Sequence, residues 1–167
     1  MESVEEFLAH AIQLEREAAD RFGQLADAMQ SAGNLEVGKL FRRLAEYSRM
    51  HLADAQERAG FRDVPRKAPD EFQWPDSESP ESAAIWTADP LISQEEALLA
   101  ALDAEMAGLD YYQQVCENSR DPEILALAKE FVEEEEEHVR ELNRWIKGGK
   151  KQVANAGNDG GQGLPEG

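Results

Sequence analysis

The sequence has almost no cysteine: Cys116 is the only one in 167 residues. One thiol cannot form an intramolecular disulfide bond, and it cannot supply the paired Cys-x-x-Cys ligands of a rubredoxin or zinc-ribbon module. The lack of such pairs excludes a cysteine-bound iron or zinc domain and is typical of a protein from a reducing compartment.

Positive charge is also scarce, with 17 Lys and Arg residues against 35 Asp and Glu and a net charge of −18. Binding to nucleic acid or to an anionic membrane needs a basic surface, so neither partner is expected. The first residues, MESVEEFLAH, lack the basic start and apolar run of a signal peptide, and no apolar run approaches membrane-spanning length. We therefore expect a cytoplasmic protein.

What the sequence does contain is four long amphipathic segments with marked starts. Ser3 and Ser93 are each followed three residues later by a glutamate, which is a capping box, and Asp121 precedes a proline at a first helical position. The predicted helices cover residues 3–30, 34–60, 93–117 and 121–147. Long helices of nearly equal length predict an all-α four-helix bundle over residues 1–147, followed by a Gly-rich tail over 148–167.

The connection between the second and third predicted helices, about residues 61–92, is too long for a simple hairpin loop. A crossover that runs along the bundle explains its length and predicts the ferritin-like topology. Phe72, Trp74, Ile85 and Trp86 are expected to hold it against the bundle. The alternative is a disordered linker.

The apolar face of each predicted helix is interrupted near its middle by polar residues. Stepping by three or four positions, the first and third helices each present one carboxylate, Glu15 and Glu105. The second presents Ser48 and His51, and the fourth presents Glu135 and His138. The neighbouring glutamates in the run FVEEEEEHVREL fall off this face, and we expect them, like His10, to be exposed to solvent.

These positions form an internal repeat. EREAADRF (15–22) parallels EMAGLDYY (105–112), and Ser48-x-x-His51 parallels Glu135-x-x-His138. Buried carboxylates are costly unless they are neutralised, and these apolar faces carry no Lys or Arg. The pattern therefore predicts a divalent metal site, and mixed oxygen and imidazole ligands suit Fe, Mn or Zn. The predicted ligands are Glu15, His51, Glu105, Glu135 and His138.

With this set of residues, the sequence over about 3–147 resembles the rubrerythrin branch of the ferritin-like di-iron carboxylate proteins. The resemblance implies that Glu15 and His51 are terminal ligands of one iron, that Glu105 and His138 serve the other, and that Glu135 bridges them. It also implies a reaction with peroxide or O₂, with Tyr112 or Tyr47 as a neighbouring redox or hydrogen-bonding group.

The sequence departs from this family in three places. It has no rubredoxin-like iron domain, so an external electron donor would be needed. Ser48 stands where the family has a second bridging glutamate, and Gly108 stands where rubrerythrins have an additional carboxylate. With one carboxylate fewer, the charge of two divalent ions is less well compensated.

Three functions fit this reading. The first is a non-haem iron protein with a mononuclear or di-iron site that acts as a peroxidase or ferroxidase. The second is a bundle that has lost redox catalysis and holds a single structural ion such as Zn²⁺, or serves as an assembly or binding module. The third is a di-iron hydroxylase of an organic substrate. We also expect a homodimer, because the long connection offers apolar surface that one bundle does not cover.

Overall fold

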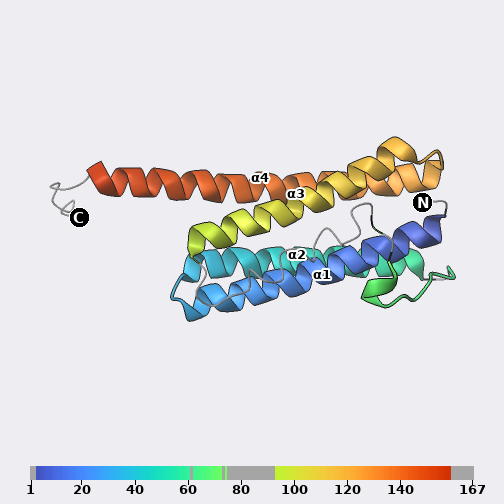
Figure 1. Ribbon diagram of the computed structural model, residues 1–167, viewed down its shortest axis with the longest axis horizontal. Helices are drawn as coiled ribbons and strands as arrows, with labels where there is room; N and C mark the ends of the chain where they lie inside the picture. The colour runs from blue at the N-terminus through green and yellow to red at the C-terminus, as the bar shows by residue number, and fades with distance from the viewer. Residues whose placement is uncertain (1–2, 61, 73, 75–92, 159–167) are drawn as a thin grey trace.

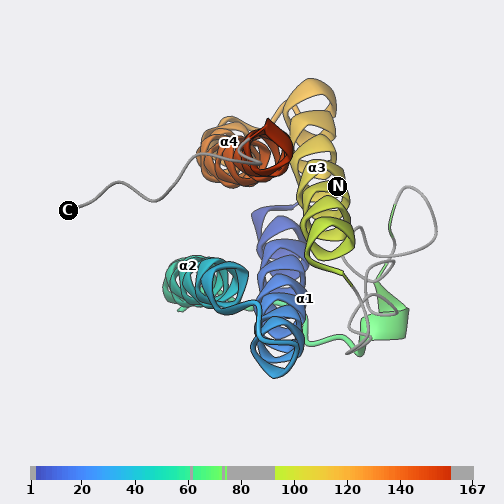
Figure 2. The same cartoon turned by 90° about the vertical axis from the view of Figure 1, so that its left-hand side faces the viewer.

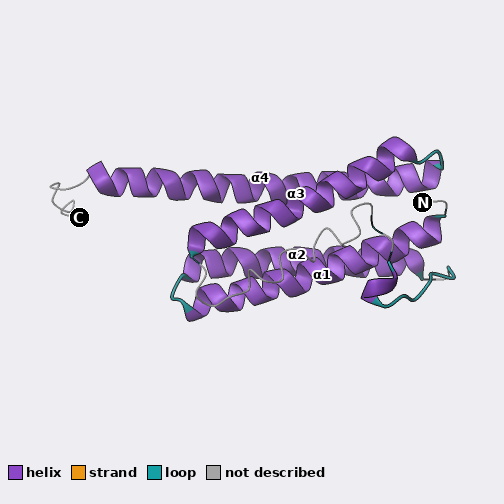
Figure 3. Ribbon diagram, in the orientation of Figure 1, coloured by secondary structure: helices purple, strands orange, loops and turns teal. Residues whose placement is uncertain are grey.

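The computed structural model describes residues 3–60, 62–72, 74 and 93–158, with side chains up to residue 148. Its four long helices are α1 (Val4–Ser31), α2 (Leu35–Ala59), α3 (Gln94–Asn118) and α4 (Pro122–Asn158), and a short 3₁₀ helix, η1, spans Pro69–Glu71. These ranges contain no strand, as Figure 3 shows. The predicted all-α four-helix bundle is confirmed.

The helices form two antiparallel hairpins, α1 with α2 and α3 with α4, which face each other across the bundle (Figure 2). Figure 1 shows that α2 and α3 run in the same direction, so α3 begins at the end of the bundle where α2 also begins. The chain must therefore return along the bundle between these helices, which is the ferritin-like topology.

Side-chain caps begin three of the helices as the sequence predicts. Ser3 Oγ accepts a hydrogen bond from the Glu6 amide, and Ser93 Oγ accepts one from the Glu96 amide, each at 3.1 Å. Asp121 Oδ1 accepts from the amides of the second and third residues of α4, at 2.8 and 3.3 Å. These bonds satisfy amides that have no carbonyl partner in the first helical turn.

The predicted end of the fourth helix at residues 147–150 is wrong, because α4 continues to Asn158 and extends beyond the other helices in Figure 1. A glycine within a helix costs only about 1 kcal/mol relative to alanine, and the following KKQVA segment consists mostly of good helix formers without proline. The pair Gly148 and Gly149 therefore does not stop the helix. Residues 159–167 lie outside the described residues, so the division into bundle and tail stays a prediction.

Two apolar clusters fill the bundle, one toward each end. The first includes Phe7, Tyr112 and Phe131, and the second includes Phe22 and Phe41. Between the two clusters the helices present buried or partly buried polar side chains, which we call the polar layer: Glu15, Arg21, Ser48, His51, Glu105, Glu134, Glu135 and His138. No helix within the described ranges has the length and apolar character needed to cross a membrane.

The start of the crossover is held against α1 by an aromatic cluster around His10. The His10 ring packs edge-on against Phe72 and Trp74, with centroid distances of 5.1 and 4.9 Å, and its Nδ1 lies 2.8 Å from the Glu6 carbonyl oxygen. His10 is only 3% exposed, so the expectation that it lies on the surface is wrong. The crossover covers a face of α1 that helical periodicity alone assigns to solvent. Ile85 and Trp86 lie outside the described residues.

Candidate metal centre

The polar layer contains all five of the predicted ligands. Glu15 (α1), Glu105 (α3), Glu135 and His138 (α4) are buried, and His51 (α2) is partly buried. The rings of His51 and His138 stack with their centroids 5.3 Å apart, so the two helical hairpins meet at this level. Metal binding by these residues stays a prediction. The distances between their side chains divide them into two groups, described below.

Glu105, Glu135 and His138, which we call the His138 group, form the more compact part of the layer. One ligand atom from each lies within 4.8 Å of the other two. His138 Nδ1 is 3.2 Å from Glu105 Oε2. Two carboxylates and an imidazole at this spacing surround a volume that suits a single cation.

The second part of the layer, the His51 group, contains Glu15, His51 and Glu134. His51 Nδ1 lies 3.8 Å from Glu15 Oε2 and 3.5 Å from Glu134 Oε2. Glu134 is 33% exposed, so the expectation that it is exposed to solvent holds only in part, because one of its oxygens faces His51. The sequence contains a signal for this position: Glu134 lies four residues before His138, and residues at this spacing lie near the same face of a helix.

Sequence reasoning also missed a buried cation. Arg21 is 2% exposed, and its Nη2 lies 3.0 Å from Glu105 Oε1. Arg21 lies three residues after Ala18 and beside Phe22, at the edge of the apolar face of α1, and both of these neighbours are buried. The polar layer thus contains its own positive charge, and one of its carboxylates is already paired.

The two carboxyls of the His138 group, Glu105 and Glu135, have pKa values shifted in opposite directions. Burial and the charge of Glu105 raise the pKa of Glu135 well above its usual range. Burial alone would also raise the pKa of Glu105, but Glu135, His138 and Arg21 outweigh it and lower this pKa to about 2. In the metal-free protein the proton therefore resides on Glu135, and cation binding at this carboxyl would release it.

Burial and neighbouring charges also shift the pKa values of Glu15 and His51 in the His51 group. Burial raises the pKa of Glu15, and the opposing effect of His51 only partly cancels this increase. Burial favours neutral His51, but the Glu15 and Glu134 carboxylates outweigh it and raise the pKa of His51. Both shifts favour a bound proton within this group when no cation is present.

Several buried polar atoms of the layer have no hydrogen-bond partner among the described residues. They include both carboxylate oxygens of Glu15, Glu135 Oε2, Ser48 Oγ and the Tyr112 hydroxyl. Buried polar atoms are rarely left without a partner, and each such atom needs an explanation. Acceptor oxygens that converge beside two imidazoles fit a divalent cation of the Fe, Mn or Zn type.

The two tyrosines proposed as neighbours of the site occupy different surroundings. Tyr47 is 39% exposed, and its ring stacks on His138 with a centroid distance of 6.0 Å. Tyr112 is fully buried, and burial, together with the charges of Glu15 and Glu135, raises its pKa well above the usual range. Tyr112 therefore remains a neutral phenol beside the layer.

A solved structure of an uncharacterized conserved protein, COG1633 from Magnetospirillum magnetotacticum MS-1, resembles this chain along most of its length. The two share 36% sequence identity with a TM-score of 0.73, over 87% of this chain and 94% of the other. The chain belongs to the COG1633 family. A scan against protein-family models and a search of curated proteins find no match.

Membership in the COG1633 family establishes the fold without establishing an activity, because the relative is itself described as uncharacterized. The polar layer of this COG1633 protein therefore has to be interpreted from its own residues. The features of the layer that bear on its function are the compact His138 group, the buried Arg21 and the serine at position 48.

Proposed function

We propose that this protein is a ferritin-like, non-haem iron-binding protein whose polar layer is the metal site. The observation that carries the proposal is the set of buried carboxylate oxygens on Glu15 and Glu135 that lack a hydrogen-bond donor beside His51 and His138. A divalent cation would satisfy these oxygens and offset the cost of burying their charge.

The His138 group is the proposed site of the first ion. The polar layer as a whole has three fully buried carboxyls, Glu15, Glu105 and Glu135, which carry one negative charge each when ionised. Arg21 carries one positive charge, and the partly exposed Glu134 is screened by solvent and is not counted. The remaining two negative charges equal the charge of one divalent cation. This balance favours a mononuclear site that is filled before any second position.

A second ion would be held by Glu15, His51 and Glu134, with Glu135 as the proposed bridge. This position is weaker, because Glu134 is partly solvated and Ser48 supplies only a hydroxyl where a carboxylate would bind both ions. Iron is the proposed metal, and Mn or Zn would fit the same ligands.

Within the rubrerythrin branch that the site resembles, bound iron would supply redox chemistry toward peroxide or O₂. The protein's own contribution is to position and shield its ligands. Arg21 orients Glu105, and the stacked His51 and His138 rings hold the two hairpins in register. Tyr112 and Phe131 stack at 5.1 Å and exclude water on one side of the layer.

A second candidate function is a bundle that holds one structural ion and has no redox activity. The buried pair of Arg21 with Glu105 favours it, because a permanent cation at this position reduces the need for a second metal. A homodimer also stays a prediction, which light scattering at micromolar concentration would test.

Anaerobic titration of the metal-free protein with Fe²⁺, followed by peroxide, tests the main proposal. We expect one tightly bound iron per chain, a weaker second one, and rapid oxidation of the bound iron after peroxide is added. Tight binding of Zn²⁺ without accelerated iron oxidation would instead support the structural-ion function. Absence of any saturable metal binding would contradict both.

Replacing Ser48 with glutamate is expected to strengthen the second metal position, since it adds a carboxylate to the centre of the polar layer. Calorimetric titration with Mn²⁺ should show a gain in affinity for the second ion of about tenfold or more, which equals about 1.4 kcal/mol, because the added carboxylate supplies a ligand oxygen and a negative charge.

The matched control for this variant is Ser48→Ala, which changes the same buried side chain without adding charge. We expect it to leave both Mn²⁺ affinities within about twofold, an energy difference well below 1 kcal/mol. Equal affinity for two ions in the wild type, with no change in Ser48→Glu, would show that this position does not limit the second ion.

A further inference from the structure

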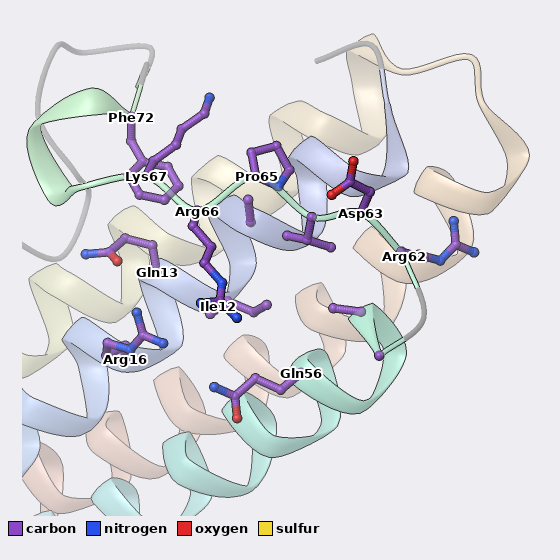
Figure 4. Close-up of a pocket in the computed structure, with 14 residues that line it drawn as sticks. Ile12, Gln13, Arg16, Gln56, Arg62, Asp63, Pro65, Arg66, Lys67 and Phe72 are labelled. Atoms are coloured by element: carbon purple, nitrogen blue, oxygen red, sulfur yellow. The ribbon is translucent and has the colours of Figure 1, made fainter.

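A cavity of about 630 Å³ lies on the outer side of α1, between α1, the end of α2 and the beginning of the crossover (Figure 4). Its helical lining includes Ile12, Gln13 and Arg16 from α1 and Gln56 from α2, and the crossover contributes Arg66 and Phe72. We call this the crossover cavity. Its volume is within the range of small-molecule sites, about 300–1,000 Å³.

Basic residues gather at this cavity in an otherwise strongly acidic protein. Arg16, Arg62, Arg66 and Lys67 line it, against Asp63 as its only acidic lining residue among those described. Arg62 is neutralised by ion pairs with Glu5 and Glu123, so it is not available to a ligand. The remaining three cations give the cavity a local positive charge.

These three cations differ from most others in the described part of the chain. Arg42, Arg43 and Arg58, for example, each form an ion pair with a carboxylate. Arg16 and Arg66 have no carboxylate within ion-pair distance among the described residues, and Lys67 lies 5.8 Å from the centre of the Phe72 ring. Three like charges with Asp63 as the one lining carboxylate among the described residues leave a net repulsion, which a bound anion would relieve.

The cavity also has groups that would orient an anion and cover an apolar body. Figure 4 shows Arg66 reaching from the crossover toward α1, where Arg16 and Gln13 project. Guanidinium groups bind carboxylate, phosphate and sulfonate oxygens with two parallel hydrogen bonds. Ile12, Val64 and Phe72 provide an apolar wall continuous with the first apolar cluster.

We propose that the crossover cavity binds a small organic anion, with Arg16 and Arg66 holding its acidic headgroup and Ile12, Val64 and Phe72 contacting its apolar body. This site is separate from the polar layer, because its lining shares no residue with the His138 or His51 group. The proposal does not depend on the identity of any bound metal.

Two fluorescent probes that differ only in the acidic group test this site: 8-anilino-1-naphthalenesulfonate and its uncharged analogue N-phenyl-1-naphthylamine. We expect saturable binding of one sulfonate per chain, which weakens as NaCl is added. The uncharged probe should bind about tenfold more weakly or worse, because it cannot accept charge-assisted hydrogen bonds.

The test variant is Arg16→Gln with Arg66→Gln, and the control is Arg120→Gln with Lys129→Gln, which removes the same charge at exposed positions outside the cavity. The test variant should lose about tenfold or more in affinity for the sulfonate and retain its affinity for the uncharged probe. The control should match the wild type, and both should keep the wild-type Mn²⁺ stoichiometry. Non-saturable sulfonate binding, an unchanged affinity in the test variant, or an equal loss in the control would overturn the proposal.

Discussion

Replacing Glu135 with glutamine is expected to abolish tight binding of the first metal ion. The change keeps the size of this buried side chain, but glutamine cannot release a proton and become negatively charged when a cation binds, and its amide is a weaker ligand in the compact His138 group. Changing a residue that only supports a metal ligand typically costs 10–100-fold in affinity. Loss of a charged ligand should cost at least about 100-fold, measured by Mn²⁺ calorimetry and by iron content after anaerobic loading.

Glu133→Gln is the matched control, because Glu133 belongs to the same glutamate run but is exposed to solvent. It removes the same charge from the same helix, so a general electrostatic effect of the acidic run would appear in both variants. We expect its Mn²⁺ affinity to stay within about twofold of the wild type, a difference below 1 kcal/mol. Equal losses in Glu133→Gln and Glu135→Gln would place the metal on the surface run and contradict the proposed site.

Arg21→Met should produce the largest loss of stability in the metal-free protein. The substitution leaves the Glu105 carboxylate buried without its positive partner, 3.0 Å away in the native structure. Removing one partner of a buried ion pair typically costs about 3–5 kcal/mol. Urea unfolding of the metal-free variant and wild type measures this loss directly.

Two comparisons separate the charge of Arg21 from its packing. Arg42→Met removes an exposed arginine paired with Asp27 at 2.7 Å, and a surface pair of this kind contributes about 0–1 kcal/mol. Adding Glu105→Gln to Arg21→Met should restore part of the lost stability, because the buried charge is removed as well. An Arg21→Met loss no larger than that of Arg42→Met would show that this ion pair does not neutralise the polar layer.

Saturating Mn²⁺ should stabilise both proteins, because a bound cation stabilises the folded state by mass action. Arg21→Met should gain more than the wild type, because the cation also neutralises the charge of Glu105 that Arg21 no longer balances. The expected result is a smaller stability difference between the two proteins with Mn²⁺ than without it. A difference that is unchanged by Mn²⁺ would indicate that metal and Arg21 act on different carboxylates.

The helix starts could be predicted from local sequence because the capping interactions are local. Ser3, Ser93 and Asp121 each bond to amides two or three residues away, so the bonding groups are adjacent in the chain before any tertiary structure forms. The end of α4 could not be predicted in the same way. Gly148 and Gly149 only weaken a helix, and a long preceding helix can continue through them.

Helical periodicity identifies which face of each helix is apolar and where that face is interrupted. This was sufficient to find Glu15, Glu105, Glu135 and His138, which lie on the axis-facing side of their helices and are buried. It was not sufficient for Arg21 and Glu134, which lie at the edge of that face. Whether an edge position is buried depends on how closely the neighbouring hairpin packs against it.

The sequence by itself therefore determined the helix starts, the all-α class, and the carboxylates and imidazoles at the centre of the apolar faces, because these depend on spacing within a single helix. Only the tertiary structure decided that Arg21 pairs with Glu105, that Glu134 approaches His51, and that His10 is covered by Phe72 and Trp74. Each of these contacts joins different helices or a helix and the crossover. Their existence depends on the rotation and separation of packed elements, which the spacing of residues within one helix does not specify.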